Sequence, residues 1–169
     1  MGTGWLRDGI WVAMALDNFS MAYLRMGKFR EAREYLYPAI NHASPLVTWC
    51  EERGSEKGAV KKTGDPQHLW TPLSIGAYMV DAFFMDSEDG HTLFAGILPE
   101  WLSDGVGVKG LRTSLGKTDL SIKQTKNGYR VKFKCEREPK GKICISIPTK
   151  DGAKQVYVSP SKKLDILVN

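Results

Sequence analysis

Apolar residues recur at helical spacing in three segments of the first half of the chain. Spacing of three or four positions gives a helix one apolar face that can pack on a core. The pattern predicts helices over about 8–25, 29–42 and 72–85, with Asp8 at the first start, Gly27 at the first end and Pro38 bending the second. The first and third are apolar on nearly all sides, so we expect neighbours around both. The second carries Lys28, Arg30, Glu31, Arg33 and Glu34 on its predicted water-facing side.

Beyond residue 90 the apolar period changes to two, which is typical of strands with one buried and one exposed face. A short strand and a helical turn are predicted over 92–102. Alternation then predicts strands over 107–115, 119–124, 129–135, 142–147 and 155–158, joined by turns such as Asn127-Gly128 and Asp151-Gly152. We therefore predict an α+β fold with two domains, a helical region over 1–90 and a C-terminal antiparallel β-sheet or sandwich unit over 91–169.

The predicted helices leave a packing problem. Three helices, two of them apolar nearly all round, cannot cover one another and a small sheet without exposing large apolar patches. We therefore expect further helices, either from a longer protein of which this chain is a piece or from another chain that completes the helical region.

Composition narrows the class of protein. A chain of 169 residues with 42% hydrophobic residues can bury a core. The net charge is +5, but the lysines are spread and alternate along the predicted strands as solvent-facing residues do, so we expect no nucleic-acid partner. The sequence has neither a long apolar run nor a signal-peptide pattern, so we expect no membrane partner, and the compartment is not indicated. The three cysteines lack metal or redox spacing; Cys135 and Cys144 could meet across a hairpin, but we expect both to be reduced.

Two polar segments are candidates for chemistry. Arg7 and Asp8 follow Trp5 at the start of the first predicted helix, where charged groups can hold sugar hydroxyls and an indole face can stack on a sugar ring. The alternative is a helix cap beside a solvated arginine. Glu51 and Glu52 follow Trp49 in the long loop 44–66, where a partly desolvated carboxylate can act as a general base. The alternative is a solvated acidic pair.

A third segment precedes the last predicted helix. His68 could carry a proton and Trp70 could contact a ligand, although a single histidine there can also serve only as a neighbour of the helix cap. Helices that begin at the same end of an antiparallel array would place this segment on one rim with Arg7-Asp8 and Glu51-Glu52. We expect no metal site, because His42, His68 and His91 are scattered, and no cofactor motif is present.

The order of these motifs resembles the C-terminal part of six-hairpin, (α/α)6-barrel glycosidases of the glucoamylase- and trehalase-like group. The resemblance covers nearly the whole chain: Trp5, Arg7 and Asp8 match a sugar-holding W-x-R-D motif, Glu51-Glu52 match the late catalytic loop, and Trp70-Thr71 match the opening of the last inner helix. The run TLFAGILPEWL is similar to the segment that closes many bacterial members.

The resemblance implies part of an (α/α)6 toroid followed by a β unit, and a glycoside hydrolase that inverts the anomeric centre. Glu51 or Glu52 would be the base, and Trp5, Arg7, Asp8, Trp49, His68 and Trp70 would bind a carbohydrate substrate. The general acid would lie in a part that this chain lacks, so the chain alone would be a poor catalyst. The alternative is a non-catalytic carbohydrate-binding or assembly module.

Overall fold

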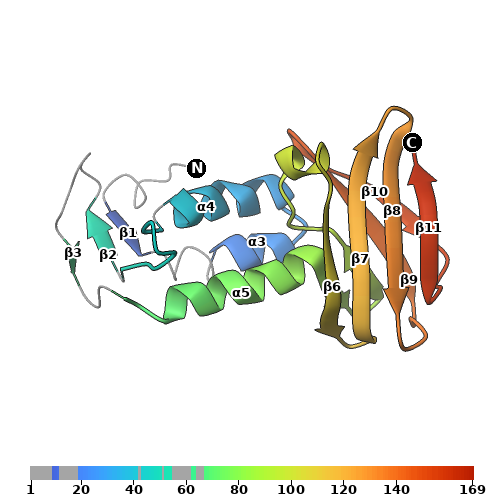
Figure 1. Ribbon diagram of the computed structural model, residues 1–169, viewed down its shortest axis with the longest axis horizontal. Helices are drawn as coiled ribbons and strands as arrows, with labels where there is room; N and C mark the ends of the chain where they lie inside the picture. The colour runs from blue at the N-terminus through green and yellow to red at the C-terminus, as the bar shows by residue number, and fades with distance from the viewer. Residues whose placement is uncertain (1–8, 12–18, 42, 51, 55–61, 64–66) are drawn as a thin grey trace. The chain divides into compact units, whose positions relative to one another are not determined.

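The computed structural model describes residues 9–11, 19–41, 43–50, 52–54, 62–63 and 67–169 (Figure 1). The chain divides into two compact units, Met1–Tyr78 and Met79–Asn169. The described part of the first holds helices and a small sheet, and the second holds two larger sheets. The sequence-based domain boundary at residue 90 stays a prediction, because a compact unit need not be an independently folding domain.

Helices α3 (Met21–Arg25) and α4 (Phe29–Asn41) are consecutive and joined by a tight turn. Gly27 has a φ of 72°, the left-handed conformation that glycine adopts without a steric penalty. Around it the Lys28 N–H donates to the Tyr23 carbonyl (2.9 Å) and the Gly27 N–H to the Leu24 carbonyl (3.1 Å), which is a Schellman end. The predicted helix stop at Gly27 is confirmed.

The apolar stripe of α4 is buried as its spacing predicts. Phe29, Ala32, Leu36 and Ala39 are all buried, and the range agrees with the predicted helix 29–42. Two expectations for this helix are wrong: Ile40, the last residue of the predicted apolar stripe, is 38% exposed, and Arg33 is only 4% exposed rather than water-facing. It lies four positions after Phe29, which puts it on the edge of the buried stripe.

The helix predicted over 8–25 is wrong at its start. Residues Gly9–Trp11 form strand β1, which pairs antiparallel with β2 (Glu52–Gly54), and β2 pairs in turn with β3 (Lys62–Thr63). Residues 12–18 lie outside the described part, and within the described residues the end of the predicted helix is α3. Ile10 and Trp11 fit a helical period and a strand equally well, because pattern alone does not distinguish short apolar runs.

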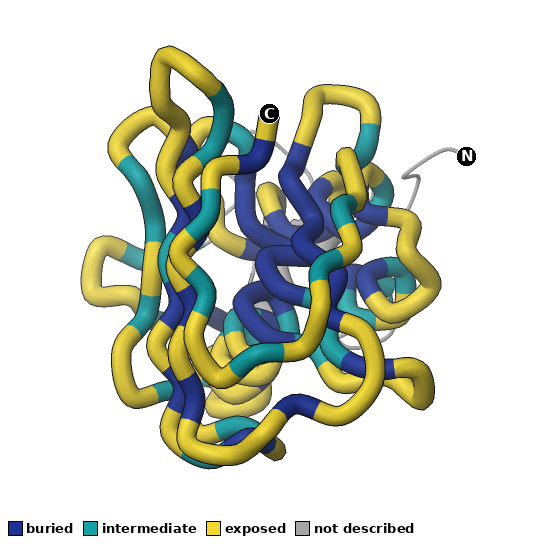
Figure 2. The backbone as a smooth tube through the Cα atoms, turned by 90° about the vertical axis from the view of Figure 1, so that its right-hand side faces the viewer, coloured by how far each residue is buried: buried dark blue, intermediate teal, exposed yellow. Residues whose placement is uncertain are grey.

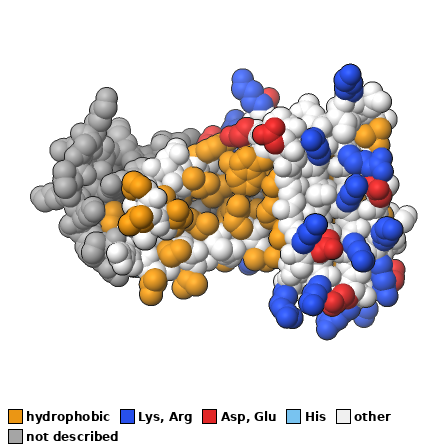
Figure 3. All heavy atoms as spheres, viewed as in Figure 1, with side chains coloured by type: hydrophobic (Ala, Val, Ile, Leu, Met, Phe, Trp, Pro, Cys, Tyr) orange, Lys and Arg blue, Asp and Glu red, His pale blue; other side chains and the backbone are white. Residues whose placement is uncertain are grey.

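Helix α5 (Trp70–Phe83) lies near the predicted range 72–85. Its buried residues Thr71, Ser74, Tyr78 and Ala82 follow one face. The expectation that it is buried on nearly all sides is wrong for the chain by itself, because Leu73 is 71% exposed and Val80 39% exposed. Hydrophobic side chains accordingly show on the surface of the helical unit (Figure 3).

The second unit contains two four-stranded sheets. One has the order β10-β9-β5-β4 and the other the order β11-β8-β7-β6, with a short 3-10 helix, η2, between β5 and β6. Every neighbouring pair is antiparallel except β5 and β9, which run parallel. The bounds are β4 Phe84–Ser87, β5 Gly90–Leu93, η2 Pro99–Leu102, β6 Val106–Thr113, β7 Gly116–Thr125, β8 Gly128–Cys135, β9 Lys142–Thr149, β10 Gly152–Val158 and β11 Lys163–Val168.

Both sheets contribute to one apolar core. Leu120, Ile122, Val131 and Phe133 come from β7 and β8, and Leu93, Ile143, Ile145 and Ile147 come from β5 and β9. Along β7 and β8 buried residues alternate with exposed ones, whereas residues 143–148 of β9 are all buried (Figure 2). This pattern confirms the predicted strands of the second half. Cys50, Cys135 and Cys144 are free thiols, and Cys135 and Cys144 belong to different sheets rather than to one hairpin.

The predicted fold class is wrong. The described residues form three short α-helices and two four-stranded sheets, which is a small β-rich fold and not part of a helical toroid. The region read as a buried inner helix begins as a strand, and Phe84 and Met85, read as the end of the third helix, begin β4. The (α/α)6 resemblance relied on short motifs, which do not determine how the chain around them is paired.

Candidate functional site

The small sheet brings together the chain next to two of the candidate segments. Strand β1 directly follows Arg7-Asp8, and β2 directly follows Glu51. In their antiparallel register Gly9 is opposite Gly54 and Trp11 is opposite Glu52. Trp5, Arg7, Asp8 and Glu51 themselves lie outside the described residues, and of Glu52 the structure describes only the backbone.

The third segment is tied to the second by a backbone hydrogen bond. The His68 N–H donates to the Trp49 carbonyl at 2.9 Å. This bond holds the start of α5 beside Trp49, which precedes the acidic pair by two residues. The strand pairing and this bond join residues that are far apart in the sequence. As a result, the chain adjacent to all three candidate segments converges within the first unit.

Trp49 has a structural role where the loop before it meets the entry to α5. Its side chain is 5% exposed, and its indole N–H donates to the Ala39 carbonyl at 2.7 Å. The loop before it is closed by the Ser44 hydroxyl oxygen, which accepts the Thr48 N–H at 3.1 Å. A buried indole whose only donor is satisfied holds the loop against α4. Contact of Trp49 with a substrate stays a prediction.

His68 and Trp70 form the more accessible part of the junction. Their rings meet edge to face, with centroids 5.9 Å apart, and Trp70 is 44% exposed. Within the described part of the chain, His68 Nδ1 and Thr71 Oγ1 are buried without a hydrogen-bond partner. Buried polar atoms are rarely left in that state. The entry to α5 therefore combines an exposed ring that can stack on a sugar with two unsatisfied polar atoms.

A buried polar group that the sequence reading missed lies deeper in the same unit. The Ser20 hydroxyl donates to the Ala32 carbonyl at 2.7 Å and also bonds with the Tyr78 hydroxyl. Burial raises the pKa of Tyr78 far above its ordinary value, against the smaller lowering effects of Ser20 and Arg33, so the phenol stays protonated. The position of Arg33 beside Phe29 on the apolar stripe was the available signal for a buried cation.

A second polar cluster lies in the β unit. Asp86 Oδ1 is 2.8 Å from His91 Nδ1 and accepts the Ser114 hydroxyl at 2.8 Å, beside a groove of about 720 Å³. In a nucleophilic triad the serine bonds to the histidine, which takes its proton. Here the serine bonds to the carboxylate instead. The cluster joins β4 to the turn after β6, and its geometry does not activate Ser114.

Among the described residues, no group of three or more His, Cys, Asp or Glu side chains could hold a metal ion. No described helix is long and apolar enough to cross a membrane. The expected absence of a cofactor stays a prediction.

Comparisons of the chain with protein-family models, with curated proteins and with solved structures give no match. No family therefore supports the resemblance to six-hairpin glycosidases, and the β-rich fold contradicts it. The candidate site therefore rests on the local arrangement of its own residues.

Proposed function

We propose that the chain binds a carbohydrate where the backbone beside its three candidate segments converges, and that it contributes a carboxylate of Glu51 or Glu52 to the hydrolysis of an O-glycosidic bond. The observation that supports the proposal is the convergence itself. Strand β1 pairs with β2, and the His68–Trp49 bond adds the entry to α5. These contacts bring together the chain next to an Arg-Asp pair, an adjacent glutamate pair and a half-exposed indole.

The proposed chemistry is inversion. One carboxylate removes a proton from water as the water attacks the anomeric carbon, while a carboxylic acid on the other side protonates the leaving oxygen. The two carboxyl groups stand about 6.5–9.5 Å apart in such enzymes, so adjacent glutamates are not expected to fill both roles. The Trp70 ring would stack on a sugar, and Arg7 and Asp8 would bind its hydroxyls.

The acid has to come from elsewhere. Among the described residues of the first unit the other carboxylates are Glu31 and Glu34, and both lie beside Arg30 on α4, at 4.0 and 3.8 Å. They balance that guanidinium on an exposed surface. The acid is therefore assigned to a carboxyl group outside the described residues of the first unit or to another chain, and the chain alone should hydrolyse slowly.

The test is hydrolysis of a panel of aryl glycosides and oligosaccharides by the protein, with the first-formed anomer read by proton NMR. The inverted anomer is expected, and Glu51→Gln or Glu52→Gln should lower the rate by about 10²–10⁴-fold. Glu34→Gln is the matched control and should leave the rate unchanged. Hydrolysis that is equally fast in all three variants would remove the loop from the mechanism.

Binding distinguishes the second candidate function. Titration of the same sugars, followed by tryptophan fluorescence, should show saturation that weakens in Trp70→Ala. Saturable binding without any turnover by the wild-type protein would favour a non-catalytic carbohydrate-binding module over a hydrolase.

A further inference from the structure

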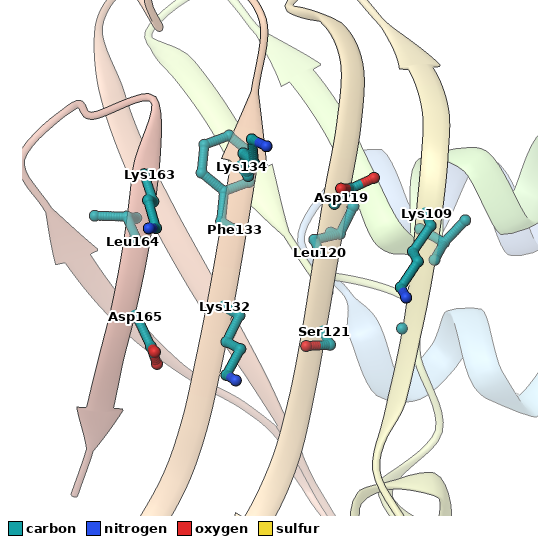
Figure 4. Close-up of a pocket in the computed structure, with 12 residues that line it drawn as sticks. Lys109, Asp119, Leu120, Ser121, Lys132, Phe133, Lys134, Lys163, Leu164 and Asp165 are labelled. Carbon is teal, nitrogen blue, oxygen red and sulfur yellow. The ribbon is translucent and has the colours of Figure 1, made fainter.

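We propose that the outer face of the sheet β11-β8-β7-β6 is a binding surface for an acidic polysaccharide. The surface is a shallow groove of about 710 Å³. Lys109, Lys132, Lys134 and Lys163 line it from β6, β8 and β11, and Ser121 lies on β7 between β6 and β8 (Figure 4). Gly107 of β6 also lines it. We call it the basic groove. It lies wholly in the second unit, so it does not depend on the proposed hydrolytic site.

The strand pattern explains the shape of the groove. Alternation along β8 buries Val131 and Phe133 and leaves Lys132 and Lys134 exposed. On β6 the outward position opposite Ser121 is Gly107, and a Cβ there would lie 2.6 Å from the Ser121 Cβ. Small residues therefore form the floor, and long lysine side chains rise on both sides of it.

The two carboxylates of the groove lie opposite lysines in the register, Asp165 opposite Lys132 and Asp119 opposite Lys134, and each also accepts a hydrogen bond from another group. Asp119 Oδ1 accepts the Gly110 N–H at 2.7 Å, at the irregularity in β6. Asp165 Oδ1 bonds with Arg130. In the part of the chain that the structure describes, none of the four groove lysines has an ion-pair partner within 4.0 Å. Their ammonium groups are available to an anionic ligand.

The cross-strand register concentrates positive charge. Three pairs of basic residues are directly opposite each other: Lys134 with Lys163, Lys123 with Arg130, and Arg112 with Lys117. Like charges in such pairs repel and destabilise a sheet. Basic side chains gather over the β unit in the space-filling view (Figure 3). An anionic chain lying across these strands would offset the repulsion, which is the charge complementarity that the inference uses.

The side chains of the face favour a polysaccharide over a nucleic acid. None of the exposed residues on the four strands, all of which are described, is aromatic, and single-stranded nucleic acids are held largely by stacking on aromatic rings. Bases in a duplex are read by a helix or ribbon that enters a groove, which a sheet face cannot do. The Ser121 hydroxyl and the second oxygen of Asp119 can instead bond to sugar hydroxyls between charged groups.

The test is calorimetric titration of the full chain with polygalacturonate oligomers, at about 50 mM and about 200 mM NaCl because screening should weaken the contact. The double variant Lys132→Gln/Lys134→Gln should lose affinity roughly 10-fold or more. The control Lys140→Gln/Lys150→Gln removes the same charge from two exposed turns and should bind like the wild type. Thermal melting of each variant verifies that it is folded.

Four results would overturn the proposal. The first is no binding of polygalacturonate by the wild type. The second is an equal loss in the control, which would mean that only net charge matters. The third is duplex DNA binding more tightly and displacing polygalacturonate from the same lysines. Neutral dextran should fail to bind to the groove, and dextran binding that is sensitive to Lys132→Gln/Lys134→Gln would also contradict it.

Discussion

Replacing Gly90 by alanine should destabilise the protein, because Gly90 lies where the parallel strands β5 and β9 approach closely. Gly90 begins β5 with a φ of +144°, a conformation that residues with a Cβ rarely adopt. A Cβ built there would lie 2.0 Å from the Lys142 carbonyl oxygen and 2.5 Å from its nitrogen. Both atoms belong to the backbone of β9, so no side chain can rotate away to make room.

The cost has two parts. Holding alanine in this φ region costs about 1–3 kcal/mol. A shift of β9 away from Gly90 would weaken the hydrogen bond from the Lys142 N–H to the Asp89 carbonyl, which is 2.9 Å long. Such a bond contributes about 0.5–1.5 kcal/mol to stability. Alanine also restricts the unfolded chain more than glycine does, which offsets about 0.4–1 kcal/mol of this cost. We expect Gly90→Ala to lower the free energy of unfolding by roughly 1–4 kcal/mol.

Gly152 provides the matched control. It begins β10 with a φ of +155°, but an added Cβ would meet nothing within 4 Å. Gly152→Ala therefore carries the conformational strain without the clash. Urea unfolding followed by circular dichroism gives both free energies from the midpoint and slope. Gly90→Ala should cost about 1 kcal/mol more than Gly152→Ala, and equal costs would refute the close approach of β5 to β9.

Three further predictions concern charge and thiols in the β unit. Lys163→Glu should raise stability by about 0.2–1 kcal/mol, because it converts the repulsive pair with Lys134 into an attractive one, as urea unfolding would measure. The hydrogen bond and the charge of Arg130 lower the pKa of Asp165 in the folded protein. The Asp165 carboxylate therefore stabilises the fold at pH values above its ordinary pKa of about 3.9, and this effect is lost as the pH falls through the lower pKa of the folded state. Melting temperatures of wild type and Asp165→Asn should therefore differ at neutral pH and converge near pH 2. Burial raises the pKa of Cys144, so Ellman's reagent at pH 8 should label it slowly until urea unfolds the protein.

Each of these predictions has a contradicting result. A lower stability of Lys163→Glu would show that the Lys134–Lys163 pair is not repulsive. If the melting temperatures of wild type and Asp165→Asn still differ in acid, their difference does not come from the titration of this carboxylate. Labelling of Cys144 at the same rate with and without urea would mean that its thiol is exposed in the native protein.

The second half of the chain could be read from its sequence more fully than the first. Strands β7 and β8 alternate strictly and are joined by Asn127-Gly128, so local chemistry alone indicates a hairpin. The parallel pairing of β5 with β9 left no local sign, because it joins distant segments. Strand β11 was missed, although Leu164, Ile166 and Val168 alternate along it.

The candidate site shows a different limit. Helices α4 and α5 followed from their apolar spacing, but β1 was read as a helix because Ile10 and Trp11 fit both periods. The pairing of β1 with β2 is a tertiary contact that periodicity does not encode. The basic groove was read as an ordinary solvated face. Only the register revealed that Lys134 and Lys163 lie opposite each other on neighbouring strands.

The parallel pairing of β5 with β9 also constrains the order in which the protein can form. Every β5 residue pairs with a residue 52 positions later, from Gly90 with Lys142 to Leu93 with Ile145. During synthesis the β4–β5 hairpin therefore leaves the ribosome well before its partner exists, with one edge unpaired. Closing so long a loop is slow, and unpaired strand edges invite association between chains. The β6–β7–β8 hairpins, whose contacts are local, are the natural first structure on which β9 can then settle.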